Sequence, residues 1–420
     1  MQFVFAAIRR ALRDADWLDA ERARAYARIL CDITLLVAVA WIALSRGGLD
    51  VDGKPIGTDF VSFWTASKLA LAGEAGAPWD TAAHWAAQRA LFGGKLSDYA
   101  AFFYPPPYLL VCLPLALLPY LWSLAVWLGA TAFAYWRVMR AFLPGLSPGV
   151  FLAFPAVLIN AGHGQNAFLS AALVGAGLLL LDTRPLLAGV SFGAMAFKPH
   201  LVLLMPFALV FARRWATLAV AAATAAAFCA VSYGVLGEPA WAGFLRDSAF
   251  AREALERNLI GDEKMQSVFS AARLLGAPLG LAYALQGLTA LAALAALFAL
   301  SRRAFRGPAE AAAAVSACLL ASPFLLDYDL TLLAIPLAWL AREGLRTGFL
   351  PWEKTALLAA FLLPLVSRVV ASAMGLPLGP LTIAAVFALT IRRGLVREAA
   401  DADRPLTLAH SPRSPLSLAG

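Results

Sequence analysis

Apolar residues form long runs along most of the chain, and short polar stretches separate these runs. The first run covers residues 29–44, and later runs cover residues 107–119, 121–136, 149–161, 166–181, 186–197, 200–212, 216–236, 278–300, 309–325, 329–341, 355–371 and 377–391. A helix needs about 20 apolar residues to cross a bilayer, so several of these runs are short for a full crossing. Short segments interrupted by Gly or Pro occur where backbone is buried in protein or lines a cavity. The pattern predicts an all-α, polytopic membrane protein with a bundle of about twelve transmembrane helices.

Arginines occur in short groups between the apolar runs. The groups are Arg9/Arg10/Arg13, Arg22/Arg24/Arg28, Arg213/Arg214, Arg302/Arg303/Arg306, Arg342/Arg346 and Arg392/Arg393/Arg397. Cytoplasmic loops of membrane proteins carry an excess of Lys and Arg. If residues 107–136 form one broken crossing, every group falls on the same side. We therefore expect a protein of the cell membrane (plasma or inner membrane) with both termini in the cytoplasm and residues 45–103 as the first extracytoplasmic loop.

The composition supports this interpretation and excludes other classes. Of the 420 residues, 61% are hydrophobic and 14% are charged, whereas soluble domains average about 25% charged residues. The net charge of +8 reflects topology and contact with anionic lipid, so we expect the bilayer and no nucleic acid as partner. The four cysteines lie within apolar runs and have no metal-ligand spacing. Three regions are expected: an amphipathic cytoplasmic segment (1–28), a transmembrane domain (29–391) and a disordered cytoplasmic tail (392–420).

The first extracytoplasmic loop contains two stretches with apolar residues at helical spacing, "FVSFWTASKLALAG" and "TAAHWAAQRALFG". We expect two short amphipathic helices on the outer membrane surface, with His84 as a surface histidine. The three prolines at 105–107 predict a sharp re-entry into the membrane, and Pro114 and Pro119 interrupt the next apolar stretch. Asp59 precedes the first of the two helices. An N-cap role alone is one interpretation of this aspartate.

Polar side chains suited to binding or catalysis lie in the segments expected to face outward. Ionisable groups at membrane depth cost about 2.5–3.5 kcal/mol each, so they are candidates for function. Lys198 follows an apolar run, and a lysine that extends to the interface is the plain alternative to a binding role. His163 and Gln165 lie in "NAGHGQN", where a helix-capping role is the alternative. Near the end of the chain, "SPFLLDYD" contains Asp327, Tyr328 and Asp329.

Together these stretches resemble the membrane glycosyltransferases of the GT-C fold, and most closely glycosyltransferase family 87. The resemblance covers about residues 30–390 and rests on the order of the Asp59 loop, "FFYPPPYLLVCLPLALLP", "NAGHGQN", "GVSFGAMAFKPH" and "LLASPFLLDYDLTLLAIP". It implies a polyprenyl-phosphate-mannose-dependent mannosyltransferase or a relative of one, with Asp59 as catalytic base and Lys198-Pro199 near the lipid-linked phosphate. Many relatives carry paired histidines after the late Ser-Pro. This chain has Asp327-Tyr328-Asp329 there instead, and an ionised carboxylate would repel a phosphate.

The residue types fit an inverting transfer of a hexose, with mannose as the expected sugar, from a polyprenyl-phosphate donor to an extracytoplasmic acceptor. One carboxylate base implies a single displacement, with Asp59 in that role. The expected phosphate-binding residues are Lys198, His200, His163 and Gln165, with Arg246 or Arg252 as further cations. The expected substrate-pocket residues are Phe60, Trp64, Tyr104, Asp327 and Tyr328.

Several alternatives and open points remain at this stage. We expect no metal or other cofactor, because the DxD spacing of Asp327 and Asp329 lies between apolar segments. The acceptor, a glycolipid, polysaccharide or protein, stays open. A transporter or flippase for a lipid-linked or hydrophobic solute is the alternative function, followed by a structural assembly subunit.

Overall fold

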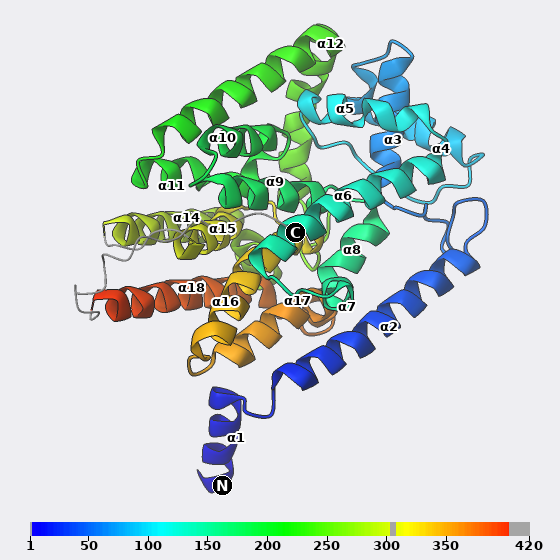
Figure 1. Ribbon diagram of the computed structural model, residues 1–420. Coiled ribbons are helices and arrows are strands. Elements are labelled where there is room, and N and C mark those ends of the chain that lie inside the picture. The colour runs from blue at the N-terminus through cyan, green and yellow to red at the C-terminus, as the bar shows by residue number, and fades with distance from the viewer. Residues whose placement is uncertain (1, 303–307, 403–420) are drawn as a thin grey trace, which may run out of the picture.

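The computed structural model describes residues 2–302 and 308–402, and its regular structure is helical (Figure 1). The first part contains α1 (Gln2–Asp14), α2 (Ala20–Leu44), α3 (Phe60–Leu71), the 3-10 helix η1 (Ala77–Trp79), α4 (Thr81–Leu91), α5 (Pro106–Cys112), η2 (Leu113–Leu117) and α6 (Tyr120–Phe142). The middle part contains α7 (Pro148–Ala153), α8 (Pro155–His163), α9 (Ala167–Leu180), α10 (Pro185–Ala194), η3 (Met195–Phe197), η4 (Pro199–Val202), α11 (Met205–Phe211) and α12 (Trp215–Glu256). The last part contains α13 (Val268–Leu274), α14 (Leu279–Ser301), α15 (Pro308–Ala321), η5 (Asp327–Leu333), α16 (Ala334–Thr347), α17 (Glu353–Met374) and α18 (Leu378–Ala402). The prediction of an all-α fold is confirmed.

Five helices of the described chain are long and apolar enough to cross a membrane: α2, α12, α14, α17 and α18. Shorter apolar helical stretches cover Pro106–Leu117, Ala167–Leu180, Pro185–Phe197, Pro199–Phe211 and Ala309–Ala321. The long helices expose large apolar side chains, such as Leu36 (69%) and Val369 (66%), which in water would be unfavourable but in lipid are well solvated. The chain is therefore a multi-pass membrane protein. The expected number of about twelve crossings stays a prediction.

The expected break at the re-entry is confirmed. Pro105 precedes α5, and Pro106 and Pro107 occupy its first turn, where a missing backbone N–H leaves no hydrogen bond unmade. The segment then changes to η2 at Leu113 and starts again as α6 after Pro119. Residues 106–142 thus form interrupted helices, as the proline positions predict.

The apolar run at 216–236 ends at a break in a long helix. α12 bends at Gly237 (φ +75°), where its conformation is not helical, and continues past Pro239 to Glu256. A proline fits the first turn of a new helix, so Gly237 turns the chain and Pro239 opens the second helical part. Figure 1 shows α12 extending along one side of the bundle beside α10 and α11.

The two helices of the first loop differ in their surroundings. Most residues of α4 are at least partly exposed, but α3 is enclosed by protein, with seven of its first eight residues buried. The Ser67 and Thr65 hydroxyls of α3 donate to carbonyls of their own helix, whereas the buried Ser62 hydroxyl has no partner among the described residues. The expectation of a surface helix is wrong for α3, which is a core element. His84 on α4 is fully buried as well, against the expectation of a surface histidine.

At both ends of the chain a helix runs across the boundary expected between the transmembrane domain and the neighbouring segment. The segment 1–28 contains α1, a turn and the first part of α2, and the backbone N–H of Trp352 donates to the Arg13 carbonyl at 2.6 Å. At the other end, α18 runs to Ala402, so the expected boundary at 391 lies inside a helix. Residues 303–307, including Arg303 and Arg306, and residues 403–420 of the expected disordered tail lie outside the described residues.

A tight turn between two short helices places the polar residues of interest. α8 ends at His163, Gly164 adopts the left-handed conformation (φ +64°), and α9 begins after Asn166. α6 packs along α9, and its Trp127 indole donates to the Gly164 carbonyl at 3.1 Å. The 3-10 helix η5 contacts both α8 and α9. Segments from three separate parts of the sequence therefore meet at this turn.

Candidate active site

Asp59 lies immediately before α3, where two turns of the chain press against each other. Its backbone N–H donates to the His163 carbonyl at 2.9 Å. Gly57 (φ +75°) and Gly164 (φ +64°) form the contact, and a Cβ added at Gly164 would lie 2.6 Å from the Phe60 Cβ. Only glycine permits both the positive φ and the close approach of the backbones. The two glycines thus hold Asp59 against the α8–α9 turn.

The Asp59 carboxylate bonds to that turn and leaves its own helix uncapped. Its side chain makes no capping hydrogen bond, so the interpretation as an N-cap alone is wrong. Oδ2 accepts a hydrogen bond from the Gln165 amide at 2.9 Å. Oδ1 lies 3.5 Å from the Thr58 hydroxyl and 3.7 Å from His163 Nδ1. About one third of the Asp59 side chain (33%) is exposed, and Oδ1 is the less firmly bonded of its two oxygens.

The surroundings of Asp59 favour its ionised form. Burial against protein raises the pKa of the carboxyl group, but the charge of His163 and hydrogen bonds from His163 and Gln165 lower it by more. Lys264 adds a smaller effect in the same direction. The pKa of Asp59 is therefore held below its ordinary value, and the group is a carboxylate at neutral pH.

Gln165 connects Asp59 with two tyrosines. Its amide nitrogen donates to Asp59 and, at 3.3 Å, to the Tyr328 hydroxyl. Its amide oxygen accepts from the Tyr104 hydroxyl at 2.9 Å and from the Asn166 backbone N–H at 3.1 Å. A glutamine amide has two donor hydrogens and two acceptor positions, so all four are used. Gln165 is only 4% exposed, and this network fixes the direction of the carboxylate.

Lys198 lies on the other side of the tyrosines and is already paired. Its Nζ is 2.6 Å from Asp329 Oδ1 and 3.2 Å from Asn166 Oδ1, and it lies over the Tyr328 ring at 5.0 Å from the centroid. Lys198 is 3% exposed and Asp329 is fully buried. A buried lysine needs such a partner, because an unpaired charge in the interior is costly. The interpretation of Lys198 as a lysine that extends to the interface is therefore wrong.

The two aspartates of "DYD" have different environments. Asp329 accepts from Lys198, whereas Asp327 accepts from the backbone N–H of Tyr328 at 2.8 Å. Their carboxylates thus do not converge on one point. Within residues 2–302 and 308–402, no group of three or more His, Cys, Asp or Glu side chains has an arrangement that would hold a metal ion.

The remaining expected site residues divide into two groups. Tyr104 and Tyr328 contact Gln165, and the His163 ring packs edge-on against Tyr328 with 5.8 Å between centroids. Phe60, by contrast, has no exposed surface and packs against other aromatic rings in the core, so it supports the turn from inside the protein. The Trp64 indole donates to the Leu118 carbonyl at 3.0 Å. His200 bonds to the Ser322 hydroxyl at 3.0 Å and packs against Phe324, apart from the Asp59 network.

Two cations near Asp59 do not stand out in the sequence. The backbone of Lys264–Gln266 pairs with Leu325–Asp327, because the Asp327 N–H donates to the Lys264 carbonyl at 3.1 Å and the Gln266 N–H donates to the Leu325 carbonyl at 2.7 Å. This pairing brings Lys264 close enough to lower the pKa of Asp59. Arg368 of α17 interacts electrostatically with His163 and Asp327. The arginines expected from the sequence, Arg246 and Arg252, lie exposed on α12.

Fold and site together define a polytopic membrane protein with an ionised carboxylate held at a junction of short helices. The chain belongs to glycosyltransferase family 87, whose sequence model matches residues 102–323, more than half of its length. The chain is therefore a membrane glycosyltransferase. The matched range includes His163, Gln165, Lys198 and His200, while Asp59 precedes it and Asp327 follows it. No curated protein and no solved structure matched the chain.

Proposed function

We propose that this glycosyltransferase moves a hexose, with mannose as the expected sugar, from a polyprenyl-phosphate donor to an acceptor on the extracytoplasmic side. The observation that carries the proposal is the Asp59 carboxylate, which is partly exposed, ionised and oriented by Gln165. Family membership favours this reaction over a transporter or flippase.

In the proposed reaction Asp59 is the general base. The acceptor hydroxyl gives its proton to Asp59 as its oxygen forms a bond to C1 of the sugar. The bond between C1 and the phosphate oxygen breaks, and its electron pair leaves with the polyprenyl phosphate. Oδ1 is the proposed proton acceptor, because Gln165 occupies Oδ2 at 2.9 Å while the nearest donors to Oδ1 are at 3.5 and 3.7 Å. We propose a single displacement with inversion at C1, with Asp59 alone as the base, because Asp327, the other carboxylate at this edge, accepts from the Tyr328 backbone N–H at 2.8 Å.

The leaving phosphate gains negative charge as the bond breaks, so cations near Asp59 stabilise the transition state. We propose Lys264 and Arg368 for this role, together with His163, because all three interact electrostatically with the acidic groups of this junction. Lys198 and His200 stay predictions as phosphate ligands. Direct contact by Lys198 requires its ammonium to leave Asp329, which lies 2.6 Å away.

The proposed substrate pocket is the space beside this junction. Tyr104 and Tyr328 have small exposed fractions (9% and 6%) next to His163, whose side chain is 27% exposed, and Asp327 lies at the same edge. Trp64 and its neighbour Lys68, which lies over the Trp64 ring at 5.0 Å, stand further along α3. Aromatic faces and a few polar groups suit a sugar.

The direct test uses Asp59→Asn in proteoliposomes supplied with a labelled polyprenyl-phosphate hexose and membrane glycolipid acceptors. Loss of the base should lower the rate of transfer by about 10²–10⁴-fold. Asp98→Asn is the matched control, since this first-loop carboxylate is 67% exposed and pairs only with Lys54. Transfer by Asp59→Asn at the rate of the control would contradict the proposal. Mass spectrometry of the product identifies the sugar and the acceptor.

The proposed phosphate role of Lys264 has a separate test. Lys264→Gln should raise KM for the donor by about tenfold, the value of one charge-assisted hydrogen bond at a partly exposed site. Lys95→Gln, which removes an exposed lysine of the first loop, should leave KM unchanged. Equal donor KM values for the two variants would exclude Lys264 from the phosphate site.

A further inference from the structure

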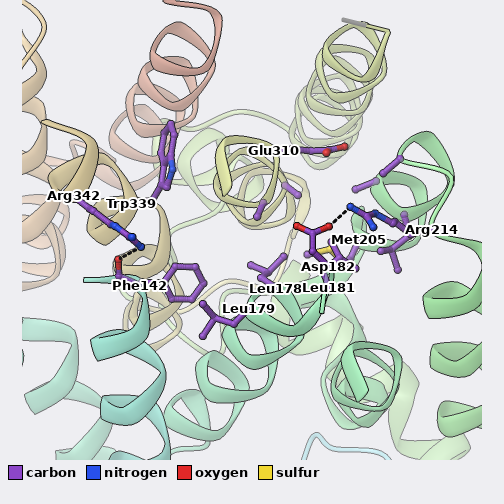
Figure 2. Close-up of a pocket in the computed structure, with 15 residues that line it drawn as sticks. Phe142, Leu178, Leu179, Leu181, Asp182, Met205, Arg214, Glu310, Trp339 and Arg342 are labelled. Atoms are coloured by element: carbon purple, nitrogen blue, oxygen red, sulfur yellow. Dashed lines mark hydrogen bonds and ion pairs between the residues drawn. The ribbon is translucent and has the colours of Figure 1, made fainter. Parts of the chain in front are cut away.

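A cavity of about 170 Å³ is lined by residues of α6, α9, α11, α15 and α16 (Figure 2). It surrounds the C-terminal end of α9, whereas the Gln165 turn precedes the N-terminal end of the same helix. The 14 residues of α9 span about 20 Å, so the two places are distinct. A cavity of about 150 Å³ is large enough for a benzene molecule, so this one has room for a small headgroup.

The cavity has an apolar floor and a charged rim. The floor includes Leu178, Met205 and Leu209, and the rim has two side chains of each sign: Asp182, Glu310, Arg214 and Arg342. Asp182 and Arg214 form an ion pair across the gap between α9 and α12. Such a balanced rim is poorly suited to a simple anion or a simple cation. It matches a ligand that carries both charges.

A residue that lines this site has a buried donor without a partner in the described chain. The indole nitrogen of Trp339, a lining residue that is 3% exposed, has no hydrogen-bond acceptor in the described chain. Buried indole N–H groups normally find an acceptor. Beside it, Arg342 is exposed and donates only a long bond, 3.5 Å, to the Phe142 carbonyl. Figure 2 shows Trp339 and Arg342 on one side of the cavity, and Asp182 and Arg214 on the other. Glu310 lies nearer to Asp182 and Arg214 than to Trp339 and Arg342.

We propose that this cavity binds the phosphoethanolamine headgroup of a membrane phospholipid. The phosphate accepts from Arg342 and the Trp339 indole, and the ammonium donates to the carboxylates of Asp182 and Glu310. An ammonium with three N–H donors suits these carboxylates better than a choline, which has none. The acyl chains extend over Leu179, which lines the cavity and is 36% exposed. The site lies at the arginine-rich end of the bundle, with Arg213, Arg214 and Arg342. The proposed lipid site does not depend on which reaction Asp59 supports.

Native mass spectrometry of the full-length protein in detergent tests this proposal. The protein is mixed with equal amounts of phosphatidylethanolamine, phosphatidylcholine and phosphatidylglycerol that have identical acyl chains. We expect about tenfold preferential retention of phosphatidylethanolamine, as for one charge-assisted hydrogen bond. Trp339→Phe, Arg342→Gln and Glu310→Gln should each reduce this preference, and Arg140→Gln, an exposed arginine of α6 that does not line the cavity, should keep it.

Four results would overturn the proposal. Equal retention of the three lipids would mean ordinary bulk lipid, and preference for phosphatidylglycerol would mean that anion attraction alone operates. Displacement of the lipid by soluble phosphoethanolamine at equal concentration would identify a site for a small soluble zwitterion. A preference that Trp339→Phe and Arg342→Gln both leave intact would place the lipid elsewhere on the protein.

Discussion

Replacing Gln165 by Leu removes the contact that orients the proposed base. The leucine side chain is similar in size but has no amide, so Asp59 Oδ2 loses its 2.9 Å hydrogen bond. The Tyr104 hydroxyl loses its acceptor at the same time. Because the lost bond stabilises the ionised carboxylate, the pKa of Asp59 rises in the variant.

The size of the effect follows from this one bond. A hydrogen bond to a charged group contributes about 1.5–3 kcal/mol. If the transition state is stabilised by that much less in the variant, kcat/KM falls by about 10- to 150-fold. The acid limb of the pH–rate profile also moves to higher pH, since more protons are bound to Asp59 at a given pH. A purely structural role for Gln165 would lower the amount of folded protein without moving this limb.

Gln286→Leu is the matched control for this experiment. Gln286 is also a buried glutamine, 5% exposed, and its amide bonds to the Phe269 N–H at 3.0 Å and to the Leu320 carbonyl at 2.9 Å. Both variants are measured for thermal stability and for transfer rate across a range of pH. The reasoning is refuted if Gln165→Leu keeps the pH–rate profile of the unmodified protein, or if Gln286→Leu moves it equally.

Two further predictions concern buried ionisable groups. Burial lowers the pKa of His84 from 6.5 to about 4, so between these pH values the folded protein keeps this histidine neutral while the unfolded chain binds a proton. The free energy of unfolding should therefore fall by about 3 kcal/mol as the pH decreases from 6.5 to 4. His84→Gln should flatten this pH dependence, as measured by thermal unfolding. Lys198→Met leaves the fully buried Asp329 without its partner and should cost about 3–5 kcal/mol, while the double variant Lys198→Met/Asp329→Leu should regain most of this stability. A double variant that is less stable than Lys198→Met would show that the ion pair itself stabilises the fold.

The sequence predicts the class of fold and several of its interruptions. Apolar runs without charges form helices whose exposed surfaces suit lipid, and three consecutive prolines start a helix at Pro106, because these properties are local. Periodicity does not say what covers a helix. For this reason α3, with apolar and small side chains on all sides, was expected at the surface and is found in the core.

For the candidate site too, the sequence predicts some features and the packing of distant segments decides the others. The sequence identifies Asp59 and Gln165 as residues of interest, since polar and ionisable groups beside apolar runs are costly. Their direct contact, and the pairing of Lys198 with Asp329 across 131 positions, depend on how distant segments pack. Lys264 gives no signal in its own loop, and only backbone pairing with residues 325–327 brings it toward Asp59.

The sequence by itself thus determined the membrane environment, the helical class and the residues able to perform proton transfer, because hydropathy and side-chain chemistry belong to each residue. The tertiary structure decided which of these groups are exposed, which are neutralised by a partner and which share a cavity. Charge pairing and burial are properties of contacts between segments, and the energy of a buried ion depends on its neighbours in space.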